Sequence, residues 1–203
     1  DIIGDRAYSR DPARVAALGR AAAEGLMAGG VAPVMKHLPG HGRARADSHQ
    51  ELPVVEAIRA ELEAVDFAPF KANADFPMAM SAHVVYTSID PAAPATLSKT
   101  VVGEIIRGLI GFDGLLMTDD LSMMALTGDF RTRAERAIGA GCDMVLHCNG
   151  HLAEARPVAE GAGELVGKAL ARAEKALESI GNVEPFDLAE ATREFDAAMG
   201  AVA

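Results

Sequence analysis

An apolar strand pattern passes directly into a loop rich in glycine and histidine in the stretch VAPVMKHLPGHG, residues 31–42. Its first part, Val31 to Met35, is apolar throughout, as expected for a short buried strand. The loop Leu38–Asp47 then interrupts the pattern, and a helical periodicity runs from Glu56 to Lys71. A strand, a polar loop and a helix in this order predict one βα unit.

Four such units follow one another along the chain. Predicted strands occupy residues 31–35, 76–82, 115–117 and 142–146, and predicted helices occupy 12–27, 56–71, 99–109 and 131–140. Asp11 and Ser98 are expected to cap the first and third of these helices. Further helices are predicted at 152–159, 164–179 and 188–199. The alternation indicates an α/β fold with a parallel sheet, either doubly wound or closed into a barrel.

The composition is that of a globular protein of 203 residues, with 50% hydrophobic and 24% charged residues. The formal net charge is −10 and no Lys/Arg cluster interrupts the acidic background, which argues against nucleic acid as a partner. No stretch approaches the ~20 apolar residues of a membrane span, so a soluble protein is expected. Cys142 and Cys148 are too few and too close together for a disulfide framework.

Polar residues gather where the predicted strands end. These clusters are Lys36-His37, Ser81-His83, Thr118-Asp119-Asp120 and His147-Asn149. Active sites of parallel α/β folds are built at the carboxyl ends of the strands, so the four clusters are expected to face one pocket. The chain contains neither G-x-G-x-x-G nor G-x-x-x-x-G-K-[ST], and a nucleotide site would therefore lack its phosphate loop.

The segment from Lys36 to Gly42, followed by Asp47-Ser48-His49, resembles a signature of glycoside hydrolase family 3, K-H-F-P-G-H-G-x-x-x-x-D-S-H. The signature is that of the family's β-N-acetylglucosaminidase branch, and this chain departs from it only in Leu38 for Phe. Further landmarks lie in the family's order, at Ile3–Tyr8, Ser81–Tyr86, Thr118–Met123 and Ala140–Met144.

The resemblance implies a TIM-type (β/α)8 barrel, in which family members have four further strands upstream of the Gly-Asp-Arg loop. This chain is then expected to hold about the second half of the barrel, strands five to eight, as one partial domain over residues 1–203. Residues 1–150 would carry the strands and active-site loops, and 151–203 the terminal helices. A truncated chain is the expectation, with the missing N-terminal half of the barrel as its partner.

By the same resemblance, the protein is a retaining exo-β-N-acetylglucosaminidase that needs no metal or other cofactor. Retention requires a carboxylate nucleophile and a proton donor for the leaving oxygen. The family's nucleophile maps to Asp119, its acid/base to His49, and the carboxylate that orients this imidazole to Asp47. Sugar-binding residues map to Arg6, Lys36 and His37. The branch implies a cytoplasmic enzyme of peptidoglycan recycling, which removes N-acetylglucosamine from cell-wall muropeptides.

The residues alone leave other interpretations open. Strand parity supports one inward aspartate but does not choose between Asp119 and Asp120, and an Asp-Asp pair also suits a helix N-terminus. An Asp-x-His pair on a loop also occurs as a surface hydrogen bond, and the three sugar-binding candidates also suit a salt-bridge network with Asp5 or Asp119. His41 is expected to shape the loop, and the weaker candidates for the pocket rim are His83, His147 and Asn149.

Three other functions remain alternatives. His37, His41, Asp47 and His49 are zinc-ligand types, although H-E-x-x-H is absent and Lys36 would repel a divalent cation. A non-catalytic half-barrel that only binds sugar is the second. The third is a β-glycoside phosphorylase of the same family, because a neutral histidine repels an incoming phosphate dianion less than a carboxylate does.

Overall fold

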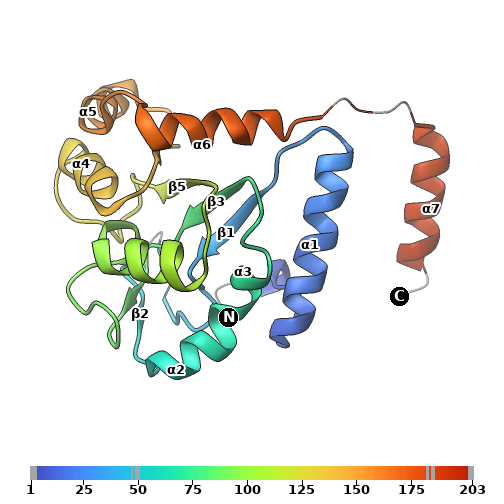
Figure 1. Ribbon diagram of the computed structural model, residues 1–203, viewed down its shortest axis with the longest axis horizontal. Helices are drawn as coiled ribbons and strands as arrows, with labels where there is room; N and C mark the ends of the chain where they lie inside the picture. The colour runs from blue at the N-terminus through green and yellow to red at the C-terminus, as the bar shows by residue number, and fades with distance from the viewer. Residues whose placement is uncertain (1–3, 47, 49–50, 182, 184–185, 201–203) are drawn as a thin grey trace.

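The computed structural model of the protein describes residues 4–46, 48, 51–181, 183 and 186–200. Four parallel strands form its central sheet, in the order β1 (Val34–Leu38), β3 (Met78–Ser81), β5 (Leu115–Asp120) and β6 (Met144–Leu146) (Figure 1). The strands follow one another as they do in the chain, without the reversal that defines a doubly wound sheet. The predicted α/β fold with a parallel sheet is confirmed.

Helices fill the connections between the strands (Figure 1). The chain runs through α1 (Pro12–Ala28), α2 (Arg59–Glu61), the π-helix η2 (Leu62–Asp66), α3 (Ala68–Ala72), the π-helix η4 (Val101–Leu109) and α4 (Phe130–Ala140). Short 3₁₀ helices lie at η1 (Gly4–Arg6) and η3 (Ala95–Leu97). The terminal helices follow β6 as predicted, at α5 (Leu152–Ala162), α6 (Gly167–Glu178) and α7 (Leu188–Gly200).

Both expected helix caps are present. Oδ1 of Asp11 accepts hydrogen bonds from the backbone N–H groups of Ala13 and Arg14, at 2.9 and 3.4 Å. Oγ of Ser98 accepts one from the N–H of Val101 at 3.0 Å. Side-chain acceptors at these positions satisfy backbone donors that have no partner inside the helix. This local chemistry explains why the two helices begin where the sequence predicts.

The largest differences from the predicted elements are in β1 and in the second helix. β1 covers 34–38 instead of 31–35, because Pro33 has no N–H to donate to a neighbouring strand. The predicted helix 56–71 is broken into α2, η2 and α3, and Pro69, which also lacks an N–H, starts the last of these. The sequence also did not predict a second, two-stranded parallel sheet of β2 (Val54–Val55) and β4 (Val85–Tyr86).

The main core lies between the central sheet and the helices. Ala79 of β3 pairs with Leu116 of β5, and both side chains are fully buried on this side of the sheet. They belong to one apolar cluster with Leu62, Phe67 and Ile105, which come from the helical layer. Burial of this apolar surface is the main contribution to the stability of the fold.

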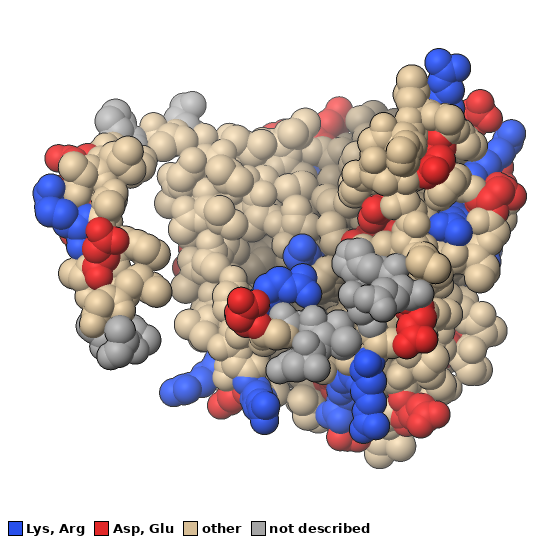
Figure 2. Space-filling model, turned by 180° about the vertical axis from the view of Figure 1, so that it is seen from behind, with Lys and Arg blue, Asp and Glu red and all other residues tan. Residues whose placement is uncertain are grey.

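The opposite face of the sheet carries a row of methionines. Strand register aligns Met80 with Met117 and Met117 with Met144, and Lys36 extends the same row onto β1. Met80 and Met117 are half-buried and Met144 is 37% exposed. Seen from behind, the molecule has a broad hollowed area with few charged side chains (Figure 2). Parallel sheets are normally covered on both faces. Here the partial exposure of this methionine row (Met80, Met117 and Met144) shows that the described residues do not cover it completely.

Candidate active site

Lys36, His37 and Asp119 lie together at the carboxyl ends of two strands of the central sheet. Lys36 and His37 belong to β1, and Asp119 belongs to β5. The Nε2 atom of His37 is 3.6 Å from Oδ2 of Asp119, and their side chains are 17% and 12% exposed. This distance is too long for a hydrogen bond. The structure therefore brings the expected nucleophile and two expected sugar-binding residues to one edge of the sheet.

The two oxygens of the Asp119 carboxylate have different surroundings. Oδ1 accepts a hydrogen bond from the backbone N–H of Asp120 at 2.9 Å, whereas Oδ2 faces the His37 imidazole. Alternation along β5 places Asp119 on the same face as Met117. This is the face of the methionine row, which the described residues leave partly uncovered. One oxygen is thus held by a hydrogen bond, and the other lies beside the His37 ring.

The Asp120 carboxylate has a different set of partners, none of which is a candidate site residue. Its carboxylate accepts hydrogen bonds from Ser122 N at 2.9 Å, Ser122 Oγ at 2.6 Å and Cys148 N at 3.1 Å. Burial raises the pKa of Asp120, but these hydrogen bonds outweigh that effect and the net pKa lies below its usual value. Asp120 caps the turn after β5 and ties it to the segment after β6; no helix begins there.

His37 is an uncharged imidazole at neutral pH. Burial lowers its pKa to about 4; the nearby Asp119 carboxylate partly opposes this shift, and the cationic side chains of Lys36 and Arg6 add to it. A charged His37–Asp119 salt bridge, one of the alternatives left open by the sequence, is therefore not formed at pH 7. Because the charge of Arg6 contributes to lowering the pKa of His37, Arg6 lies near the same site.

The loop after β1 is anchored by polar contacts and by close packing. The Tyr86 hydroxyl donates a hydrogen bond to the carbonyl of Gly40, and Arg43 Nε donates to Asp66 Oδ2 at 2.6 Å. Gly40 has φ +151, and a Cβ there would lie 3.1 Å from the carbonyl oxygen of Asp66. The close approach explains the glycine. The ring of His41 packs edge-on against His37, with centroids 5.6 Å apart.

The expected acid/base pair lies outside the described residues. This pair is Asp47 and His49; of the Asp-Ser-His tripeptide the structure describes only Ser48. Ser48 is buried, its carbonyl accepts a hydrogen bond from Ala125 N at 3.3 Å, and its hydroxyl lies 3.8 Å from the sulfur of Met123. The loop is therefore fastened to the segment that follows Asp119 and Asp120.

Two of the weaker candidates do not lie at a pocket rim. His83 is fully buried, with its ring between Thr96 Oγ1 at 2.9 Å and the carbonyl oxygen of Asp120 at 3.0 Å. The side chain of His147 is 4% exposed and packs edge-on against Phe130. Only Asn149 is exposed. Thr96 carried no sequence signal, because it sits in a Pro/Ala-rich loop that meets His83 only in the folded chain.

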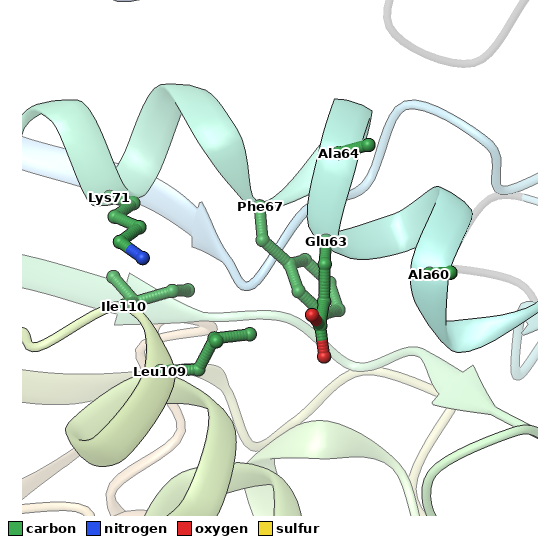
Figure 3. A pocket seen from close by; sticks show the side chains of 7 residues that line it. All are labelled: Ala60, Glu63, Ala64, Phe67, Lys71, Leu109 and Ile110. Carbon is green, nitrogen blue, oxygen red and sulfur yellow. The ribbon is translucent and has the colours of Figure 1, made fainter.

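A cavity of about 340 Å³ lies elsewhere, in the helical layer. Side chains from the η2–α3 region and from the end of η4 face each other across it (Figure 3). Its lining residues are Ala60, Glu63, Ala64, Phe67, Lys71, Leu109 and Ile110. None of the described site residues is among them, so this cavity is separate from the candidate site at the strand ends.

A zinc site is not assembled by the residues that the structure describes. Within these ranges, no group of three His, Cys, Asp or Glu side chains is arranged to hold a metal ion. Two of the zinc-ligand types considered above, Asp47 and His49, lie outside the ranges.

No helix in the described parts of the chain is long and apolar enough to cross a membrane.

The family model for the glycosyl hydrolase family 3 N-terminal domain matches residues 1–180. The chain belongs to glycoside hydrolase family 3. A β-hexosaminidase of Bordetella avium is 45% identical over 152 residues, which are 73% of this chain and 43% of that protein. The chain thus spans less than half the length of this family 3 relative.

Solved family 3 structures share the fold. A β-N-acetylglucosaminidase from Paenibacillus sp. str. FPU-7 matches with a TM-score of 0.78 and 31% identity, over 92% of this chain and 39% of that one. NagZ from Neisseria gonorrhoeae, in complex with N-trifluoroacetyl-D-glucosamine, matches with a TM-score of 0.76 and 36% identity, over 89% of this chain and 52% of that one.

Proposed function

We propose that this chain is part of a retaining exo-β-N-acetylglucosaminidase that releases terminal N-acetylglucosamine from muropeptides or related glycosides. The observation that carries the proposal is the Asp119 carboxylate at the end of β5, with Oδ1 held by a backbone N–H and Oδ2 3.6 Å from the uncharged His37. The similarity to β-hexosaminidases, and the sugar analogue bound by the Neisseria relative, support this substrate class.

The proposed reaction has two displacements. In the first, Asp119 Oδ2 bonds to the anomeric carbon, the bond to the leaving oxygen breaks, and His49 gives that oxygen its proton. In the second, His49 takes a proton from water, the water oxygen bonds to the anomeric carbon, and Asp119 is released. Asp47 orients the imidazole of His49 and stabilises its protonated form.

Lys36, His37 and Arg6 bind the sugar in this proposal. The uncharged His37 offers one donor and one acceptor to sugar hydroxyls, and Lys36 offers donors from the neighbouring position. Their place on β1 beside Asp119 supports the assignment. A sugar held there would bring its anomeric carbon to the carboxylate without a metal or other cofactor.

We further propose that the sheet is half of a (β/α)8 barrel, strands five to eight, within one partial domain. The uncovered methionine row and the sequential strand order support this. Upstream strands would pair with the free edges of β1 and β6 and bury the row inside the barrel. The muropeptide substrate and the cytoplasmic location belong to the same proposal and rest on the family resemblance.

Hydrolysis of a chromogenic β-N-acetylglucosaminide by the protein that contains residues 1–203 tests the activity. Turnover that survives a metal chelator is expected. Loss on chelation would favour the zinc alternative, and binding of the sugar without turnover would favour a non-catalytic module. Release of sugar 1-phosphate in phosphate buffer, in place of free sugar, would identify a phosphorylase.

The acid/base role of His49 needs a separate experiment. His49→Ala is expected to slow substrates with poor leaving groups far more than activated aryl glycosides, because an activated phenolate departs without full protonation. Equal rate losses for both substrate classes, with no accumulation of the glycosyl-enzyme intermediate, would refute that role.

A further inference from the structure

His83 lies directly behind the segment that carries Asp119, and the proposed reaction assigns it no role. The side chain is fully buried after β3. Its Nε2 atom is 3.0 Å from the carbonyl oxygen of Asp120, and its Nδ1 atom is 2.9 Å from Oγ1 of Thr96. A buried imidazole with a partner on each nitrogen has a defined tautomer, and the chemistry of the partners identifies it.

The Asp120 partner determines the position of the ring proton. A carbonyl oxygen only accepts hydrogen bonds, so Nε2 of His83 must carry the proton and donate. Burial lowers the pKa of His83, which keeps the ring uncharged at neutral pH. Nδ1 is then left with a lone pair and accepts a hydrogen bond from the hydroxyl of Thr96.

The surroundings of Thr96 agree with this assignment. Its single hydroxyl proton lies within reach of both His83 Nδ1 and the carbonyl oxygen of Ala82, at 2.9 and 3.0 Å. The Ala82 carbonyl already accepts the backbone N–H of Thr96 at 3.3 Å, so it has a partner without the hydroxyl. The Ser81 hydroxyl, 2.7 Å away, donates to Thr96 Oγ1. If these hydrogen bonds ran in the opposite direction, a lone pair on Nε2 of His83 would face the carbonyl oxygen of Asp120.

The chain of hydrogen bonds ends on the peptide group next to the proposed nucleophile. The Asp120–Leu121 peptide is held on both sides, because its oxygen accepts from His83 and its N–H donates to the carbonyl of Leu146 at 2.9 Å. These two hydrogen bonds fix the orientation of the Asp120–Leu121 peptide group. The backbone N–H of Asp120 in turn donates to Oδ1 of Asp119.

We propose that His83 is a positioning residue for Asp119. Its Nε2–H holds the carbonyl of Asp120 and so limits movement of the Asp120 backbone, whose N–H holds Oδ1 of Asp119 and leaves Oδ2 for the anomeric carbon. The inference rests on the proposed function, in which Asp119 is the nucleophile. Misplacement of a reacting group by about 1 Å costs roughly a hundredfold in rate, so a hydrogen bond behind the nucleophile has a measurable effect.

Two variants of the active protein that contains this chain separate the donor from the volume of the ring. His83→Phe keeps a ring without a donor and is expected to lower kcat by roughly a hundredfold, with KM changed less than about threefold. His83→Gln keeps an N–H at similar reach and is expected to recover most of that loss. A fluorinated N-acetylglucosaminyl inactivator should label Asp119 more slowly in His83→Phe, in parallel with kcat.

A stability control and an activity-independent measurement complete the test. Val158→Ala removes buried apolar contacts between α4 and α5, and should lower Tm while leaving kcat and KM unchanged. In ¹⁵N-histidine NMR spectra of the wild-type protein at neutral pH, the His83 ring should be in the uncharged Nε2–H tautomer.

The possible results are distinct. If the wild type is active and His83→Phe, like Val158→Ala, lowers Tm without changing kcat, the positioning role is overturned and the proposed function remains intact. An Nδ1–H tautomer, or a charged His83 ring at neutral pH, would overturn the proposed series of hydrogen bonds. An inactive wild type, or labelling at a residue other than Asp119, would refute the proposed function itself.

Discussion

Oδ2 of Asp119 lies 3.6 Å from Nε2 of an uncharged His37, while Oδ1 of the same carboxylate is held by the N–H of Asp120. The two carboxylate oxygens therefore differ, one being fixed and one facing the site. This asymmetry separates Asp119 from its neighbour Asp120, whose carboxylate accepts hydrogen bonds from Ser122 and from the backbone N–H of Cys148.

Substitution of the two neighbouring aspartates should have very different effects. Asp119→Ala removes the group that forms the covalent intermediate and is expected to lower kcat by roughly 10⁴-fold or more. Asp120→Asn keeps an acceptor for Ser122 N and Cys148 N, so the loss should stay within about tenfold. Steady-state kinetics of both variants check this. Equal losses, or an intermediate trapped on Asp120, would contradict the assignment.

Acid should destabilise the protein through His37. Between about pH 6.5 and 4 the unfolded chain protonates this histidine and the folded chain does not, because its folded pKa is about 4. The free energy of unfolding should therefore fall as the pH drops through this window, by at most roughly 3 kcal/mol from His37. Below about pH 4 both states are protonated and this contribution falls no further. Burial lowers the pKa of His83 as well, in the same direction.

His37→Gln is the matched control for that pH dependence. The variant keeps a polar side chain but does not titrate, so its stability should change less between pH 6.5 and 4 than that of the wild type. Urea unfolding at several pH values provides the measurement. An unchanged pH profile in the variant would show that other groups control the acid sensitivity.

The Asp143 carboxylate should be essential for the stability of the fold. It is 8% exposed and accepts hydrogen bonds from Arg107 at 2.7 Å, Arg172 at 2.9 Å and Leu116 N at 2.9 Å, so it joins η4, β5 and α6. Asp143→Ala leaves two largely buried guanidinium groups without this partner and is expected to cost about 3–5 kcal/mol.

Asp113→Ala provides the comparison for Asp143→Ala. Asp113 pairs with the same Arg172 at 2.5 Å, but its side chain is 87% exposed, so its loss should cost less than about 1 kcal/mol. Chemical denaturation measures the loss in the free energy of unfolding for each of the two variants. Similar losses would mean that burial does not determine the strength of these ion pairs.

The 203 residues expressed alone are expected to self-associate and to be inactive, because β1 and β6 are edge strands and the methionine row is uncovered. Met144→Glu should reduce association of the isolated chain, yet should destabilise a protein in which the proposed upstream strands bury the row. Light scattering and activity assays, with and without the upstream half supplied in trans, measure both effects. A monomeric, fully active isolated chain would contradict the half-barrel proposal.

The βα alternation and most element positions followed from local information in the sequence. Asp11 and Ser98 mark helix starts because a cap acts within three residues of its own position. The loop signature from Lys36 to His49 identified the family, since its residue types and spacing are themselves the signal. Prolines explain the errors: Pro33 delayed β1, and Pro69 divided the predicted helix.

The family resemblance favoured Asp119 over Asp120 as nucleophile, but the different partners of the two carboxylates and the position of His83 were visible only in the tertiary structure. Both distinctions depend on partners far away in the chain, such as Cys148 for Asp120 and Thr96 for His83. The same holds for the charge of His37, because burial by the folded chain lowers its pKa. Sequence patterns report residue type and spacing, whereas the role of a polar side chain depends on which atoms surround it after distant segments have met.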